Sequence, residues 1–196
     1  MRVWTHLASW LVKSGEVSQL ELGDTFREVS VRASCWSVAD AQGPDELDLV
    51  PGPDPTGEPS LHYSLTGEVS WRREPASMLV RTGDLAFVVE PREGSVAESR
   101  LPEVGDRVTV LATLDVMGAY ETDAFDYPDV RRDWLVRGLK VERRELVTSP
   151  AFPDTREPGH IMRMDDITQM LRWADATSRD HATYVLDLEP FGPAAG

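Results

Sequence analysis

The side chains of this sequence that could hold a charged ligand lie in two short segments where arginine adjoins tryptophan. The arginines of these segments are Arg72, Arg73, Arg131 and Arg132. Arginine beside an exposed aromatic ring suits single-stranded nucleic acid, because the guanidinium binds phosphate while the ring stacks on bases. Acidic residues adjoin both segments, namely Glu74, Asp129 and Asp133. Ion pairs between neighbouring surface side chains are therefore the competing interpretation.

A loop between residues 120 and 129 mixes acidic and aromatic side chains. Its carboxylates are Glu121, Asp123, Asp126 and Asp129, and Phe125 and Tyr127 lie among them. Hard cations prefer several oxygen ligands on a turning loop, but the ligand spacing and the glycine of an EF-hand are missing. Three interpretations fit this pattern: a plain surface loop, a protein-binding loop that uses Phe125 and Tyr127, or a loop of cation-binding or catalytic acids.

No motif of enzyme chemistry is present in the sequence. It contains no phosphate loop, dinucleotide fingerprint, HExxH pattern or GxSxG pattern. Its single cysteine, Cys35, can form neither an intramolecular disulfide nor a cysteine metal cluster, and we expect it to be a buried thiol. We predict no catalytic residue, no metal and no cofactor. The alternative is an enzyme whose groups converge only in three dimensions, for example His62 with the acids of residues 121–129.

The net charge of the chain indicates which classes of binding partner are favoured and which are disfavoured. The 196 residues carry a formal charge of −14, spread over residues 1–60 (−6), 61–147 (−4) and 148–196 (−4). An acidic surface opposes binding to nucleic acid and to anionic membranes, and it favours a basic protein partner. No apolar run approaches the roughly 18 residues of a membrane helix. The N-terminus lacks the features of a signal peptide, so we expect a cytoplasmic protein without a membrane partner.

Alternating polarity predicts five β-strands through the middle of the chain: Leu61–Trp71, Met78–Arg81, Leu85–Glu90, Arg107–Val116 and Trp134–Val147. In the first strand every odd position is apolar or Gly67, which is the period of a half-buried strand. The glycine predicts a bend or bulge. The same period places Trp71 on the core side of the strand.

The order of these strands resembles an OB-fold over residues 61–147. A long first strand is interrupted by Gly67, a short hairpin follows, Gly105–Val110 leads into the fourth strand, and the last strand comes after a longer loop. The resemblance implies a five-stranded Greek-key barrel that binds oligonucleotides, oligosaccharides or proteins. It would set the four arginines named above at the edge of the binding face.

Residues 1–42 contain two further predicted strands, near Val3–Val12 and Thr25–Val38. The alternation of the second strand changes phase at Trp36, where a bulge would restore the packing. These strands either extend the barrel or form a small separate lobe.

The remaining segments are predicted to be irregular, except for one helix. Residues 43–60 are rich in proline and glycine and predict a linker or a long surface loop. Residues 148–196 predict a loop, a helix near 166–176 and a tail, because Asp166 and Gln169 have the spacing of a capping box.

We therefore predict a mainly β protein: a five-stranded OB-like barrel with an N-terminal β-extension and one C-terminal helix. The preferred function is a non-enzymatic cytoplasmic binding or protein-interaction module. Its partner-binding residues would be Arg72, Arg73, Phe125, Tyr127, Arg131 and Arg132. The alternatives are a single-stranded nucleic-acid-binding protein, which the charge disfavours, and an enzyme with a site assembled only in three dimensions. The sequence leaves the oligomeric state open.

Overall fold

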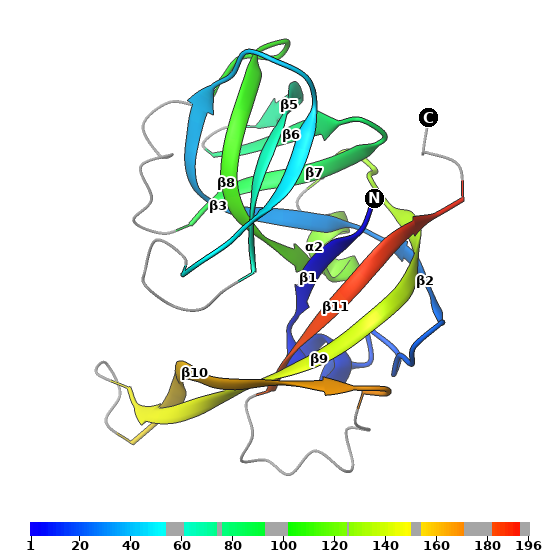
Figure 1. The fold of residues 1–196 in the computed structure, drawn as a ribbon, viewed down its shortest axis with the longest axis vertical. Helices are drawn as coiled ribbons and strands as arrows, with labels where there is room; N and C mark the ends of the chain where they lie inside the picture. Colours follow the sequence, from blue (N-terminus) through cyan, green and yellow to red (C-terminus); the bar gives the residue numbers. More distant parts are fainter. Residues whose placement is uncertain are drawn as a thin grey trace. The chain divides into compact units, whose positions relative to one another are not determined.

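The computed structural model describes residues 1–53, 61–73, 76–92, 102–124, 126–149, 154–170 and 182–192. Over these ranges the protein is mainly β, with eleven strands and two short helices (Figure 1). The chain divides into two compact units. The barrel unit comprises Arg27–Asp133 with Phe191–Gly196, and the terminal unit comprises Met1–Phe26 with Trp134–Pro190.

Five strands close a mixed β-barrel in the barrel unit. They are β3 (Val31–Asp40), β5 (His62–Arg73), β6 (Ser77–Thr82), β7 (Leu85–Pro91) and β8 (Arg107–Val116). Antiparallel pairing runs from β3 to β8, β5, β6 and β7 in turn, and the parallel pairing of β7 with β3 closes the ring (Figure 1). At the level of the fold this ring confirms the OB-like barrel.

The strand that completes the barrel comes from an unexpected part of the chain. β3 lies in the segment predicted as an N-terminal extension, whereas the predicted fifth strand is β9 (Arg132–Thr148), which belongs mostly to the terminal unit. Both segments alternate in polarity, but β3 is the one that pairs with both β7 and β8. The closing strand therefore precedes the other four strands in the chain instead of following them.

Inward side chains at alternate positions fill the barrel. On β3 these are Val31, Ala33 and Cys35, each at most 2% exposed. Fully buried residues on the other strands include Leu65, Val69, Val80, Phe87, Val89, Val110 and Leu114. Burying one large aliphatic or aromatic side chain contributes about 1.5–3 kcal/mol, so this alternation holds the ring together. The pairing of β3 with β8 shifts register between Cys35 and Ser37, which confirms the bulge predicted at Trp36.

β5 bends so that it can pair with two other strands of the barrel, β8 along residues 62–68 and β6 along residues 68–73. At Gly67 an added Cβ would lie 2.1 Å from the carbonyl oxygen of Arg81, so the close approach requires glycine. The register with β6 shifts between Val69 and Trp71. Trp71 consequently packs with Leu79 in a cluster on the outer surface of the barrel. Trp71 thus packs against a buried hydrophobic cluster, as expected for a core residue, but on the face opposite Val69, because a bulge reverses the faces of a strand.

β4 (Glu46–Val50) pairs with β5 and lies inside the segment 43–60, where no regular structure was predicted. Pro44 and Pro51 bound this strand without interrupting it, so its five residues keep their backbone donors. Residues 54–60 lie outside the described ranges. One helix, α2 (Ala119–Ala124), forms within the acidic loop.

Antiparallel strands form the terminal unit. β1 (Val3–Leu7) pairs with β11 (Ala182–Phe191), and β9 pairs with β10 (Arg156–Ile167). β9 and β11 are neighbours in the sheet. β2 (Thr25–Val29) carries the chain from the terminal unit into the barrel unit.

The second helix of the described chain, α1 (Ser9–Ser14), lies in the terminal unit. It ends at Gly15, whose φ of +82° is the left-handed conformation that favours glycine. The predicted strand Val3–Val12 is therefore strand only as far as Leu7. Neither α1 nor α2 has the length and apolarity to cross a membrane, and no other helix occurs in the described ranges.

The helix predicted near 166–176 does not form in the part of that segment that is described. Asp166 and Ile167 end β10, and the Asp166 carboxylate accepts a hydrogen bond from Lys140 at 2.7 Å. Gln169 forms a bridge with Glu21. Pairing with other strands satisfies the backbone groups that a helical turn would otherwise pair, so the capping-box spacing is not used. Residues 171–176 lie outside the described ranges.

Candidate functional site

Two of the predicted binding arginines, Arg72 and Arg131, carry acidic partners from the barrel unit. Arg72 Nη1 lies 2.7 Å from Glu103 Oε1, and Arg131 Nε lies 2.9 Å from Asp129 Oδ1. The hydrogen bond with Arg131 lowers the pKa of Asp129. Exposed pairs of this kind contribute only about 0.2–1 kcal/mol each to stability, but they reduce the positive charge that phosphate would meet.

The other two predicted arginines lie on the same unit. Arg132 Nη1 donates to the carbonyl oxygen of Asp84 at 3.0 Å. Arg73 is exposed at the end of β5, opposite Ser77 on β6. The structure therefore does not gather the four arginines into one cluster of unshielded positive charge.

Tyr127 is half-buried on the outer surface of the barrel. Its ring meets that of Trp71 edge-on at 6.1 Å between centroids, and its hydroxyl donates to Glu90. Burial and the Glu90 hydrogen bond together raise the pKa of Tyr127 to about 12. Phe125, the other aromatic residue predicted to bind a partner, lies outside the described residues.

The outer face of β6 and β7 is covered by the protein's own chain. Leu79 and Val88 on this face are buried together with Met117, and Trp71, Tyr127 and Val130 pack against them. In OB-folds the second and third strands carry much of the oligonucleotide-binding face. β6 and β7 hold those places after the long strand β5, so Met117, Tyr127 and Val130 cover the surface where bases would stack.

Ion pairs hold this covering segment to the barrel. Arg32 on β3 lies 3.2 Å from Glu90 on β7 and 3.3 Å from Glu121 on α2. Burial disfavours the charge of Arg32, but Asp115, Glu121 and Glu90 outweigh burial and raise the pKa of Arg32. The same Glu90 receives the Tyr127 hydroxyl. We therefore attribute a positioning role to these acids, including Glu121 of the acidic loop.

A hollow of about 430 Å³ opens beside these ion pairs, lined by Arg32, Ser34, Glu90, Pro91, Arg92, Thr113 and Asp115. Ser34 donates to Asp115 at 2.6 Å. Arg92 lies over the Trp36 ring at 4.8 Å, and His62 meets that ring edge-on at 5.9 Å. Glu121 accepts hydrogen bonds from Arg32 and from the backbone of Gly118. His62 therefore packs against the Trp36 ring, whereas the carboxylate of Glu121 is held by the hydrogen-bond donors of Arg32 and Gly118.

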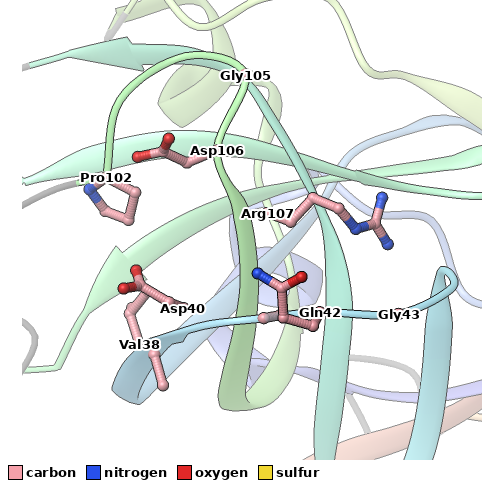
Figure 2. Close-up of a pocket in the computed structure, with 10 residues that line it drawn as sticks. Val38, Asp40, Gln42, Gly43, Pro102, Gly105, Asp106 and Arg107 are labelled. Carbon is pink, nitrogen blue, oxygen red and sulfur yellow. The ribbon is translucent and has the colours of Figure 1, made fainter.

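A second hollow of about 760 Å³ lies where β3 ends and β8 begins (Figure 2). Asp40 and Asp106 lie on one side of it, and the Arg107 guanidinium points away from both (Figure 2). Arg107 instead donates to Asp45 at 2.8 Å. The described rim of this hollow is therefore acidic.

The described residues offer no cluster of metal ligands, and their cysteine thiol is buried. These ranges contain no group of three or more histidine, cysteine, aspartate or glutamate side chains placed to hold a metal ion. Cys35 is fully buried, as predicted, and burial raises the pKa of its thiol to about 11. A thiol that stays protonated is a poor nucleophile.

The terminal unit contains a buried charge that sequence patterns did not reveal. Glu142 on β9 is fully buried; its Oε1 lies 3.3 Å from His6 Nε2, and its Oε2 lies 3.4 Å from Arg144 Nη2. His6 and Glu142 are 136 residues apart in the chain. No local motif could have paired them.

The tertiary grouping of the chain changes the distribution of charge. The barrel unit holds ten arginines, no lysine, and 21 aspartates and glutamates, which gives it a net charge of −11. The terminal unit carries the other −3. The net charges of residues 1–60, 61–147 and 148–196 are similar to one another, because this division separates the acidic residues 27–60 from the rest of the barrel unit.

The chain matches no protein-family model, no curated protein and no solved structure. The geometry and charge of its two units are therefore the basis on which its function can be inferred.

Proposed function

We propose that this protein is a non-enzymatic binding module that holds a basic protein partner on its barrel unit. The observation that carries the proposal is the net charge of −11 on that unit. An excess of one sign of charge accelerates encounter with partners of the opposite sign and repels partners of the same sign. The proposal keeps the cytoplasmic location expected from the sequence.

The contacts of the aromatic and arginine residues weigh against the nucleic-acid alternative. Trp71 and Tyr127 contact each other on the face where bases would stack, and Arg72 and Arg131 are paired with acids. Binding to single strands needs unshielded cations beside open aromatic rings. A protein partner with lysine or arginine on its surface needs neither.

Fluorescence anisotropy with three labelled probes tests the proposal: a peptide alternating lysine and valine, a matched peptide alternating glutamate and valine, and a thymidine oligonucleotide. We expect this protein to bind the lysine peptide alone. Binding should weaken as salt rises from about 0.05 to about 0.5 M, because screening shortens the range of charge interactions. An unrelated acidic protein of similar size and net charge is the control for unspecific attraction.

Two results would contradict the proposal. The lysine peptide could bind this protein no more tightly than it binds the acidic control protein. The oligonucleotide could bind in preference to the lysine peptide, which would support the nucleic-acid alternative instead.

A further inference from the structure

β4 is an edge strand of the barrel unit. In the described ranges it pairs with β5 on one side, and no strand pairs with its other side. An open strand edge presents a row of backbone donors and acceptors to which another extended chain can add. The five residues of β4 would accept a partner segment about 17 Å long.

Contacts at its beginning hold this edge in place. Asp45, directly before β4, accepts hydrogen bonds from the Gly83 backbone and from Arg107, both at 2.8 Å. The carbonyl oxygen of Glu46 accepts a bond from the Thr82 hydroxyl at 3.4 Å. An edge that is ordered before binding loses less conformational entropy when a partner strand is added.

One face of β4 carries negative charge without a cation to balance it. Glu46 and Asp48 stand opposite Thr66 and Ser64 of β5, and neither carboxylate has a cationic partner among the described residues. A hydrogen bond and the like charge of Asp48 raise the pKa of Glu46. A lysine or arginine on an added strand would relieve this repulsion.

The other face of β4 carries apolar side chains that the barrel leaves partly uncovered. Leu47 and Leu49 stand opposite Leu65 and Tyr63. Leu65 is fully buried and Tyr63 is 3% exposed, but Leu49 is 47% exposed. Apolar side chains on an added strand would extend the barrel core over Leu49.

Pairing of the β4 edge with the β4 edge of a second copy of this chain would be unfavourable. Antiparallel pairing of two β4 strands would bring Glu46 and Asp48 of one copy against the same carboxylates of the other. Like charges directly opposite each other on neighbouring strands are destabilising. The edge therefore disfavours self-association and favours a partner of opposite charge.

We infer that the β4 edge is the docking site for the basic partner, which adds an extended segment of alternating cationic and apolar residues as a further strand. The cations would face Glu46 and Asp48, and the apolar side chains would cover Leu49. This inference rests on the proposed function and narrows it to one edge of one strand.

Charge reversal at the edge is the first test. In the anisotropy experiment with the lysine–valine peptide, we expect the double substitution Glu46→Lys and Asp48→Lys to weaken binding at least about tenfold, because two attractive opposite-charge contacts across the strands become repulsive. The matched control is the double substitution Asp123→Lys and Asp129→Lys, which changes the net charge equally at two exposed positions that pair with Arg131 and not with β4 or the turn that holds it. The control variant should bind about as tightly as the unaltered protein does.

Backbone methylation of the peptide is the second test, and it leaves the protein unchanged. In strand addition only one edge of the peptide bonds to β4, so N-methylation of alternate residues should abolish binding in one frame and preserve it in the other. Equal binding of both frames, or equal loss in the two charge-reversed variants, would overturn the docking site while leaving the proposed function intact. Failure of the unaltered protein to bind the peptide would overturn both. Sedimentation that shows a dimer abolished by Glu46→Lys would assign the edge to a second copy.

Discussion

Glu142 keeps its charge inside the terminal unit because His6 and Arg144 approach its two oxygens. Burial alone would raise the pKa of Glu142, but the hydrogen bond and charge of His6, together with Arg144, outweigh burial and lower that pKa below its usual 4.5. A carboxyl whose pKa is lower in the folded state stabilises the fold above its ordinary pKa. That contribution is lost as the pH falls through the lowered value.

Substitution Glu142→Gln tests this role at the scale of one residue. The amide keeps the shape but removes the charge, so we expect the free energy of unfolding at neutral pH to fall by about 1–3 kcal/mol in urea denaturation. Glu145→Gln, an exposed position on the same strand, should change it by less than about 0.5 kcal/mol. The difference between Glu142→Gln and the unaltered protein should shrink as the pH falls below 4.5. A difference independent of pH would show that the ionised form of Glu142 is not what stabilises the fold.

At the scale of elements, the bend of β5 lets one strand pair with both β8 and β6 in the closed barrel. Gly67 permits the bend, and the register shift before Trp71 sends that ring to the outer surface. Alternation in the sequence predicted this strand and the importance of Gly67. It could not predict the face of Trp71, because a bulge depends on the partner strand as much as on the strand itself.

Substitution Gly67→Ala tests the bend. The added methyl would meet the Arg81 carbonyl oxygen at 2.1 Å, so we expect thermal or urea denaturation to show a loss of about 3 kcal/mol, the upper range for an overpacked site. Gly105→Ala is the control, since no atom lies within 4 Å of its added Cβ. Its φ of +96° still disfavours alanine, at a cost of about 1–2 kcal/mol. Equal losses in both variants would mean that the approach of β5 to β6 is not tight.

At the scale of the whole molecule, the barrel is closed by a strand that comes before the other four. β3 supplies the parallel contact with β7 and the antiparallel contact with β8. The predicted boundaries 61–147 leave this strand out, whereas the compact barrel unit begins at Arg27. The same grouping collects the acidic charge of −11 on one unit.

Two fragments test the origin of the closing strand. We expect residues 27–133 to give a dispersed amide NMR spectrum and a cooperative unfolding transition. Residues 61–147 should remain unfolded or aggregate, because without β3 the edges of β7 and β8 are open. A cooperative fold for residues 61–147 would show that β9 can take the place of β3.

Local patterns determined much of this protein by themselves: its mainly β character, the positions of most strands, the buried thiol at Cys35, and an acidic composition. These follow from side-chain period and charge, which each segment carries wherever it lies in the fold. The outcome at Asp166 and Gln169 shows the limit of such patterns, since a capping-box spacing did not prevent Asp166 from ending a strand.

Only the tertiary structure decided which strand closes the barrel, which acid pairs with Arg72, and that β4 forms an open acidic edge. Each of these depends on a partner distant in the chain, and an alternating segment carries no mark of the strand it will pair with. The acids beside the arginines were visible in the sequence. The contact between Trp71 and Tyr127 on the covered face of the barrel was not visible there, because it depends on the tertiary structure.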